Sequence, residues 1–282
     1  MNRLLVRVCS VFLLGQSFNC RASPTPTIPL NFCQLRPMFM EDFHNFRLNP
    51  WNISGSEWIA HTPWHGDFGD AAFSNPGPNG PFAVVNGTLD ITARKGTDGQ
   101  WHSGLIAAAD GTGHGHGVLY GYFEARMKLP PGPGTWPAFW LAQLQPVGTK
   151  SPAAEIDVIE YYGKFLNAYH VTIHEWYHNS SHTWYRGKTI NVPKNSLVTG
   201  WHDYGVRILP NYITFFFDRR PVWQQPTPPE LNKPLYPIVD LALGSGWPIT
   251  DTPNPSVLKI QYVHVYEYAP MSRCKNASHT NP

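Results

Sequence analysis

Apolar and polar residues alternate with a period of two along several stretches of this chain. In residues 119–130, the apolar Phe123, Ala125 and Met127 alternate with charged residues, and residues 169–176 repeat the pattern. Successive side chains of a β-strand point to opposite faces, so this period predicts strands with one buried and one polar face.

An Asn-Gly pair divides residues 84–93 into two short apolar runs. Asn86 and Gly87 tolerate the left-handed backbone of a two-residue hairpin turn, so we predict a β-hairpin here. The preceding residues 61–83 carry aromatic side chains among prolines and glycines. Long irregular loops of this kind are often functional, and we expect this one either to form a rim over a cleft or to pack on the surface.

Three carboxylates lie in residues 152–162, whose β-branched and aromatic residues predict a strand. In a regular strand Glu155 and Asp157 share a face, while Glu160 points the other way. A β-bulge between Asp157 and Glu160 adds one residue and turns Glu160 onto the same face. We therefore predict a bulged strand with an acidic patch. The alternative is the solvated face of an edge strand, although edges more often carry lysine or mixed charge.

Such a patch has the chemistry of glycoside cleavage. In retaining glycosidases one carboxylate attacks the anomeric carbon and a second protonates the leaving oxygen, with the two groups about 5–5.5 Å apart. A third acid between them raises the pKa of one neighbour by repulsion and hydrogen-bonds to the other, so that one starts protonated and the other ionised. The hypothesis from these residues is a glycosidase.

Composition narrows the fold class. Charged residues make up 14% of the chain and aromatic residues also 14%, with 11 Trp, 28 Pro and 24 Gly. Many short strands joined by Pro and Gly turns predict an all-β sandwich or barrel. The aromatic surplus suits stacking on sugar rings, whereas a formal charge of +2 gives no support for binding nucleic acid. No polar linker or repeat divides the chain, so we expect one large domain.

Residues 1–22 have the features of a secretory signal peptide: two early arginines, an apolar stretch and a Cys20–Ala22 cleavage site. The apolar stretch is too short to span a membrane, so we expect an exported protein that acts as a monomer. Removal of this segment leaves Cys33 and Cys274, one near each end. In an oxidising compartment they could form a disulfide, and the alternative is two unpaired thiols.

Several motifs occur together in the order typical of one enzyme family. Tyr-Gly-Tyr-Phe-Glu-Ala-Arg-Met-Lys-Leu-Pro (120–130) precedes Gly-Thr-Trp-Pro-Ala-Phe-Trp (134–140), and Glu-Ile-Asp-Val-Ile-Glu (155–160) follows. This arrangement resembles glycoside hydrolase family 16, in the bulge-containing form of laminarinase-like members. The resemblance is strongest over residues 84–178. It implies an all-β jelly-roll sandwich of two curved antiparallel sheets, like concanavalin A, with a sugar-binding cleft on the concave face.

The resemblance also implies roles for individual residues. Glu155 matches the nucleophile, Glu160 the general acid/base and Asp157 the acid that assists the nucleophile. The candidate substrate-binding residues are Trp101, Trp136, Trp140, His174 and Trp247. An aromatic face over a pyranose buries apolar surface without requiring one hydroxyl pattern. For Trp136, Trp140 and His174 the alternative is a packed position in the core.

We therefore expect residues 38–270 to form the catalytic domain of a secreted, retaining endo-β-glycosidase, between a Pro/Thr-rich leader (23–37) and a tail (271–282). The expected substrate is a β-1,3- or mixed β-1,3/1,4-glucan. The alternatives are a galactan or bacterial exopolysaccharide, a transglycosylase that uses the same residues, or a non-catalytic carbohydrate-binding module. Leu105 stands where many relatives carry Arg, so one polar substrate contact is expected to be absent. Gln261 stands where calcium-binding relatives often carry Asp, so we predict no metal and no other cofactor.

Overall fold

A computed structural model of the chain describes residues 29–177 and 184–269. The predicted signal peptide and the C-terminal tail with Cys274 lie outside these ranges. Cys33 is exposed, and its pairing with Cys274 stays a prediction. The first strand begins at Leu35, so it starts inside the segment that we expected to be a leader.

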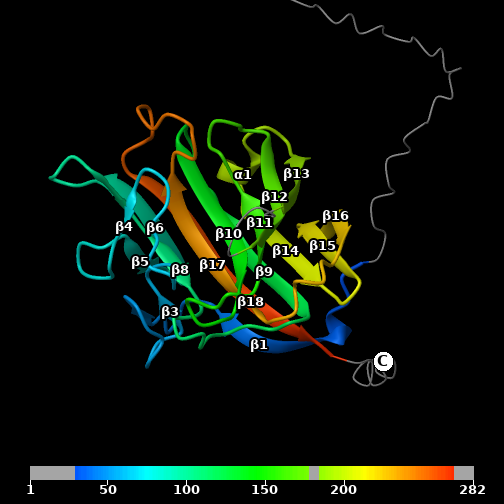
Figure 1. Ribbon diagram of the computed structural model, residues 1–282. Helices are drawn as coiled ribbons and strands as arrows, with labels where there is room; N and C mark the ends of the chain where they lie inside the picture. The colour runs from blue at the N-terminus through cyan, green and yellow to red at the C-terminus, as the bar shows by residue number, and fades with distance from the viewer. Residues whose placement is uncertain (1–28, 178–183, 270–282) are drawn as a thin grey trace, which may run out of the picture.

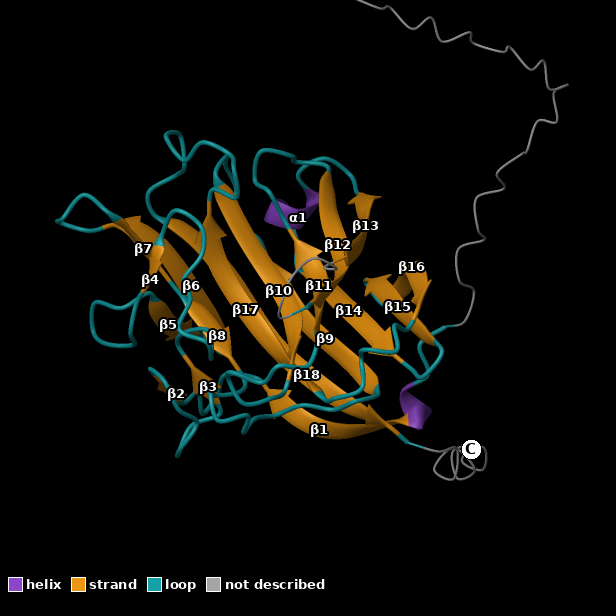
Figure 2. Ribbon diagram, viewed as in Figure 1, coloured by secondary structure: helices purple, strands orange, loops and turns teal. Residues whose placement is uncertain are grey.

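The described residues form two β-sheets packed face to face, with very little helix (Figures 1 and 2). The strands of the ten-stranded sheet are β1 (Leu35–Glu41), β4 (Ala72–Phe73), β5 (Phe82–Val85), β6 (Thr88–Lys95), β7 (Trp101–Ser103), β9 (Gly121–Lys128), β14 (His202–Ile208), β15 (Tyr212–Phe217), β16 (Arg220–Pro226) and β18 (Ser256–Tyr268). Their order is β16-β15-β14-β9-β18-β6-β7-β4, with β1 paired to β18 and β5 paired to β6.

The second sheet has eight strands in the order β13-β12-β11-β10-β17-β8-β3-β2. They are β2 (Leu48–Asn49), β3 (Trp58–Ile59), β8 (Leu105–Ala107), β10 (Thr135–Gln143), β11 (Ala153–Glu160), β12 (Ala168–Trp176), β13 (Trp184–Asn191) and β17 (Leu235–Leu243). The helical segments are η1 (Phe32–Gln34) and α1 (Ser196–Thr199). No helix within the described ranges is long and apolar enough to cross a membrane.

This architecture confirms the predicted all-β jelly-roll sandwich. Its strand pairs are antiparallel except for two short parallel pairs, β2 with β3 and β4 with β7, so the sheets are mixed where we expected only antiparallel pairing. The predicted hairpin is also present. Asn86 and Gly87 join β5 to β6, and both have the positive φ that such a turn requires.

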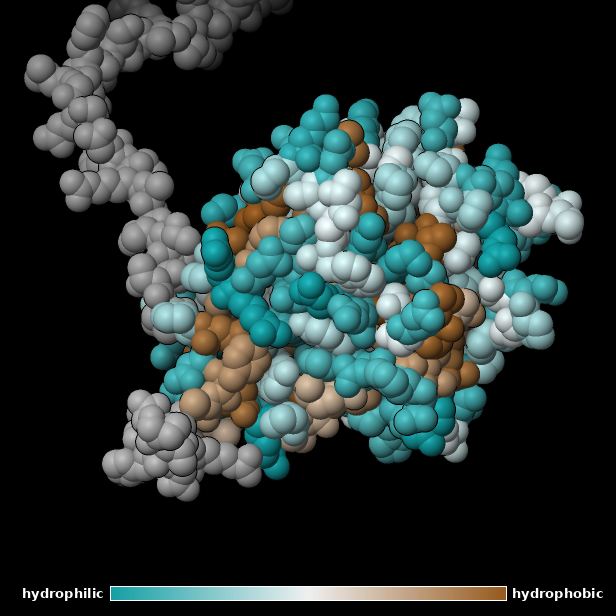
Figure 3. Space-filling model, turned by 180° about the vertical axis from the view of Figure 1, so that it is seen from behind, coloured by the Kyte–Doolittle hydropathy of each residue, from teal (hydrophilic) through white to brown (hydrophobic). Residues whose placement is uncertain are grey.

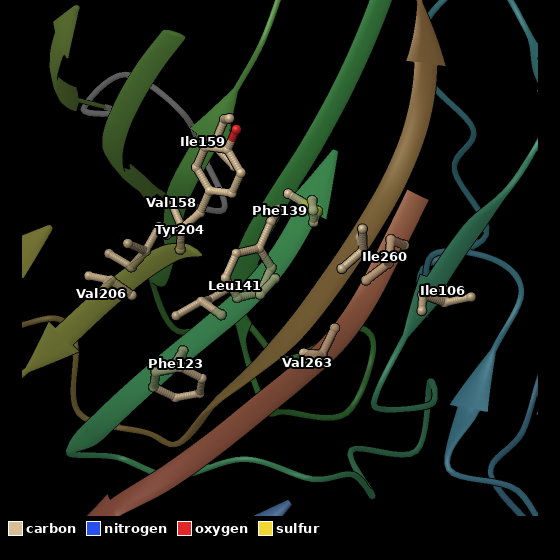
Figure 4. Packing of buried hydrophobic residues seen from close by; sticks show 14 of the residues in the cluster. Ile106, Phe123, Phe139, Leu141, Val158, Ile159, Tyr204, Val206, Ile260 and Val263 are labelled. Carbon is tan, nitrogen blue, oxygen red and sulfur yellow. The ribbon is translucent and has the colours of Figure 1, made fainter. Parts of the chain in front are cut away.

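Apolar side chains from the inner faces of both sheets form the main core (Figure 4). Phe139 and Leu141 of β10, Phe123 of β9 and Val263 of β18 are all fully buried there. Burying a side chain of this size contributes about 1.5–3 kcal/mol, so this layer holds the two sheets together. Seen from behind, the surface is mostly polar with scattered apolar patches (Figure 3), as is usual for a globular protein.

A second apolar cluster covers part of the outer face of the eight-stranded sheet. There Ile238 of β17 and Leu105 of β8 are fully buried, and Phe68 from the loop of residues 61–83 packs against the cluster. The outer face of β11, β12 and β13 carries partly exposed residues instead. The opening over these three strands is where the acidic residues lie.

Candidate active site

A β-bulge in β11 brings the three predicted acids to one face. The register of β11 slips between Asp157 and Glu160 on the β12 side, with a matching slip on the β10 side. The two residues in the bulge, Val158 and Ile159, are both buried in the main core. Glu155, Asp157 and Glu160 line the same hollow. The predicted bulge is therefore confirmed.

Glu160 is held by two donors on one oxygen. Trp136 Nε1 donates to Glu160 Oε1 over 3.1 Å, and the Tyr162 hydroxyl donates to the same atom over 3.2 Å. The two aromatic rings stack with their centroids 6.2 Å apart. This arrangement leaves Glu160 Oε2 without a hydrogen bond from the described residues, so Oε2 is the oxygen that can exchange a proton with a substrate.

Asp157 lies between the other two acids and beside an imidazole. His174 Nε2 is 3.1 Å from Asp157 Oδ2, and Glu155 pairs with His174 across the β11–β12 ladder. One ligand atom each from Glu155, Asp157 and His174 lie within 4.8 Å of one another. These three residues could hold a cation, but proton chemistry at the cleft needs the same atoms.

Burial controls the protonation of this group. Burial, reinforced by the negative charge of Asp157, raises the pKa of Glu155 to about 8. Burial, and then the charges of Glu160 and Asp240, also raise the pKa of Asp157 well above its usual range. Glu155 and Asp157 therefore hold at least one proton between them at neutral pH.

Asp240 is a fourth carboxyl group in the site, and the sequence analysis missed it. It lies on β17, and only Ala138 of β10 separates it from Glu160 in the ladder. Trp140 Nε1 donates to Asp240 Oδ1 over 2.8 Å, and the Ala242 amide donates to Oδ2 over 3.0 Å. Burial raises the pKa of Asp240 to about 8. Its sequence signal was a single acid in the otherwise apolar run of β17, where an unpaired charge is costly.

Aromatic residues form a rim above the acids. This agrees with the first of our two expectations for residues 61–83, a rim over a cleft. Phe68 packs edge-on against Trp136 and Trp140, with centroid distances of 5.5 and 6.1 Å. Trp64 lies 6.0 Å from Trp140. Trp136 is partly exposed, whereas Trp140 is almost fully buried. Trp140 therefore forms part of the cleft floor.

Two other predicted binding residues lie elsewhere. Trp101 is buried in the main core, because β7 belongs to the ten-stranded sheet and its indole points between the sheets. We therefore withdraw Trp101 as a substrate-binding candidate. Trp247 lies on the loop after β17, in edge contact with Phe165 and beneath the Lys164 ammonium. Its role in binding stays a prediction.

Three connected hollows form a groove over the sheet. The catalytic hollow, of about 330 Å³, is lined by Trp64, Phe68, Trp136, Ala138, Trp140, Glu155, Asp157, Glu160, His174, Trp176 and Asp240. The aromatic hollow, of about 480 Å³, is lined by Trp64, Glu155, Trp176 and Tyr236, and by Ala142, Gln143 and residues 145–149 among others. The polar hollow, of about 480 Å³, is lined by Glu160, Tyr162, His170, Thr172, His174, Tyr185, Gly187, Lys188 and Thr189.

Comparison with known proteins agrees with the fold described above and with the motifs found in the sequence. Residues 79–264 match the family model described as glycosyl hydrolases family 16. The endo-1,3-1,4-beta-glycanase ExsH of Rhizobium meliloti (strain 1021) is 30% identical over 82% of this chain and 52% of its own length. The endo-1,3-1,4-beta-glycanase EglC of the same organism is 32% identical over 66% of this chain and 39% of its own. The chain thus spans about half of these relatives or less.

Among solved structures, the laminarinase from Flavobacterium sp. UMI-01 has the same fold. The superposition has a TM-score of 0.64 at 24% identity, and it covers 82% of this chain and all of that one. At this level of identity the likeness establishes the fold alone.

Proposed function

Because the chain belongs to glycosyl hydrolases family 16, we propose that it cleaves a β-linked polysaccharide internally, with retention at the anomeric carbon. A β-1,3- or mixed β-1,3/1,4-glucan is the first candidate substrate. The names of the two Rhizobium relatives, both endo-1,3-1,4-beta-glycanases, support this choice. The observation that carries the proposal is the bulge that places three carboxyl groups on one face, in a hollow walled by tryptophans.

In the first step, the Glu155 carboxylate attacks the anomeric carbon and Glu160 transfers its proton to the glycosidic oxygen. The bond between that carbon and oxygen breaks, the leaving sugar departs as an alcohol, and the donor sugar remains as an ester on Glu155. In the second step, Glu160 takes a proton from water as the water oxygen attacks the same carbon. The ester bond breaks and Glu155 is released as a carboxylate.

The neighbouring groups act on these two acids differently. The charge of His174 lowers the pKa of Glu155 and so favours its carboxylate form, whereas the charge of Asp157 raises this pKa. The hydrogen bonds from Trp136 and Tyr162 fix one oxygen of Glu160, so the proton travels on the other. The buried indole–carboxyl pair of Trp140 and Asp240 holds the floor of the hollow in one conformation.

The test is to digest a panel of β-glucans, galactans and bacterial exopolysaccharides and to identify the oligosaccharides released. We expect the wild-type protein to cleave a β-glucan to short oligosaccharides. The Glu155→Gln variant should lose this activity while its circular dichroism spectrum is unchanged. Full activity in Glu155→Gln would overturn the assignment of the nucleophile. Cleavage of a galactan alone would change the proposed substrate class from a β-glucan to a galactan. Binding of a glycan without cleavage would leave only a carbohydrate-binding module.

A further inference from the structure

A serine, a histidine and an aspartate form a hydrogen-bonded chain outside the groove. The Ser74 hydroxyl lies 3.3 Å from His102 Nδ1, and His102 Nε2 lies 2.9 Å from Asp98 Oδ2. Ser74 follows β4, His102 lies on β7, and Asp98 lies in the loop between β6 and β7. Figure 2 shows β4 and β7 on the opposite side of the molecule from β12 and β13. None of the three residues lines the hollows over the acids.

The hydrogen bonds require one tautomer of His102. An ionised carboxylate only accepts hydrogen bonds, so His102 Nε2 carries the ring hydrogen and donates it to Asp98. Nδ1 then has a free lone pair, which accepts from the Ser74 hydroxyl. The hydrogen bond from the Gln100 amide, and then the one from His102, lower the pKa of Asp98, so this residue is ionised at neutral pH. A histidine held in this way can take the serine proton.

The backbone around the three residues fixes this geometry. The Ser74 amide donates to the Ser103 carbonyl over 2.9 Å, so the pairing of β4 with β7 places Ser74 beside His102. Gly96 lies where the loop comes closest to the imidazole. A Cβ there would lie 2.7 Å from Asp98 Oδ1 and 3.1 Å from His102 Nε2. Glycine at this position therefore leaves room for the two side chains to meet.

A small pocket opens beside the serine. It has a volume of about 160 Å³, and Ser74 and His102 line it together with Asn79, Thr92 and Arg94 among others. Pockets for drug-sized ligands are about 300–1,000 Å³, so this one suits a short chemical group. Arg94 is exposed, and its guanidinium brings N–H donors of fixed geometry to the pocket, which suit an oxyanion.

We propose that Ser74, His102 and Asp98 form a second catalytic site, independent of the proposed function, which hydrolyses esters of short carboxylic acids. Ser74 is the nucleophile, His102 the general base and Asp98 a positioning residue, and Arg94 stabilises the oxyanion. The same three side-chain types act together in serine hydrolases on unrelated folds. There the serine contacts Nε2 and the aspartate contacts Nδ1. Here the two nitrogens are exchanged, which still leaves one donor and one acceptor on the ring.

The reaction has two steps. In the first, Ser74 Oγ bonds to the ester carbonyl carbon while His102 Nδ1 takes the hydroxyl proton, and Arg94 stabilises the charge on the carbonyl oxygen. The bond from that carbon to the alcohol oxygen then breaks, and His102 gives the proton to the departing alcohol. In the second step, His102 takes a proton from water as the water oxygen attacks the acyl carbon. The bond to Ser74 breaks, His102 protonates the serine oxygen, and the carboxylic acid leaves.

The test uses para-nitrophenyl acetate as substrate and a fluorophosphonate probe, which bonds covalently to an activated serine. The wild-type protein should hydrolyse the ester and carry the probe on Ser74, located by peptide mass spectrometry. Ser74→Ala should lose both the hydrolysis and the label. His102→Gln should lower kcat/KM for the ester about 100–10,000-fold, which is the contribution of a positioned general base. Thermal melts should establish that each variant folds.

Asp98→Asn tests the positioning role. An asparagine amide can donate to His102 Nε2, which moves the ring hydrogen to Nδ1 and removes the acceptor for the serine. The kcat for the ester and the rate of probe labelling should therefore fall together while KM stays the same. Asp98→Glu, which keeps the carboxylate, should restore part of both. Ser54→Ala and His44→Gln, at an exposed serine and an exposed histidine, are the matched controls and should change neither.

Three results would refute the second site. They are an absence of ester hydrolysis in the wild-type protein, hydrolysis that persists at the wild-type rate in Ser74→Ala, and a probe that labels another residue in place of Ser74. Glu155→Gln separates this test from the proposed function, because it should hydrolyse the ester at the wild-type rate although it cleaves no glycan.

Discussion

Replacing Glu175 with glutamine should stabilise the protein in alkaline solution and leave its stability unchanged in acid. Glu175 lies on β12 between His174 and Trp176, but it points away from the cleft, and its side chain is fully buried. Neither carboxyl oxygen has a hydrogen-bond partner among the described residues. Burial, together with the nearby charge of Glu230, raises the pKa of Glu175 to about 7.

The sign of the effect follows from proton linkage. Because the folded-state pKa lies above the usual value of 4.5, folding favours the protonated form. The folded protein bears no penalty below about pH 4.5 and loses stability as the pH rises from there through about 7. At about 1.4 kcal/mol per pKa unit, the full loss is about 3 kcal/mol. Glutamine never ionises, so the variant does not undergo this loss of stability.

The measurement is thermal or urea unfolding of both proteins at pH 4, 6 and 8. For a protein of this size, about 3 kcal/mol corresponds to a rise in Tm of about 6–12 °C at pH 8, with no difference at pH 4. Glu57→Gln is the matched control. The hydrogen bond from Arg47 lowers the pKa of Glu57, so its replacement should cost stability at pH 8 and nothing in strong acid. If Glu175→Gln lowers the Tm at pH 8, the buried carboxyl group is paired and the reasoning fails.

Two further predictions concern the cleft. Trp136→Phe keeps an aromatic ring but removes the hydrogen-bond donor to Glu160. Because a hydrogen bond to a charged group contributes about 1.5–3 kcal/mol, kcat should fall about 10–100-fold with little change in Tm. An unchanged kcat would mean that Tyr162 alone orients Glu160. Asp157→Asn removes the charge that helps to raise the pKa of Glu155, so the acidic limb of the residual kcat/KM profile should move to lower pH, and a shift to higher pH would contradict the repulsion that we infer.

The reactive strand could be predicted from the sequence because its pattern is local. Glu155 and Asp157 are two residues apart, and only an inserted residue brings Glu160 to their face, so the spacing itself requires the bulge. The Asn86–Gly87 hairpin was predictable for the same reason, since two residues determine the turn.

The remaining features depend on which strands become neighbours, and a period-two pattern does not report that. Trp101 looked like a cleft residue, but β7 joined the ten-stranded sheet and carried its indole into the core. Asp240 reaches the site only because β17 lies beside β10, about a hundred residues away in sequence.

Chemical rescue with azide tests the central assignment most directly. With an activated aryl β-glycoside as substrate, Glu155→Ala leaves a space where azide can attack in place of the carboxylate, and the account predicts an α-glycosyl azide. Glu160→Ala still forms the ester on Glu155, so azide then displaces it to give the β-glycosyl azide. If the two variants gave the opposite anomers, or if neither was rescued while the wild-type protein cleaved the substrate, the roles assigned to these two carboxyl groups would be contradicted.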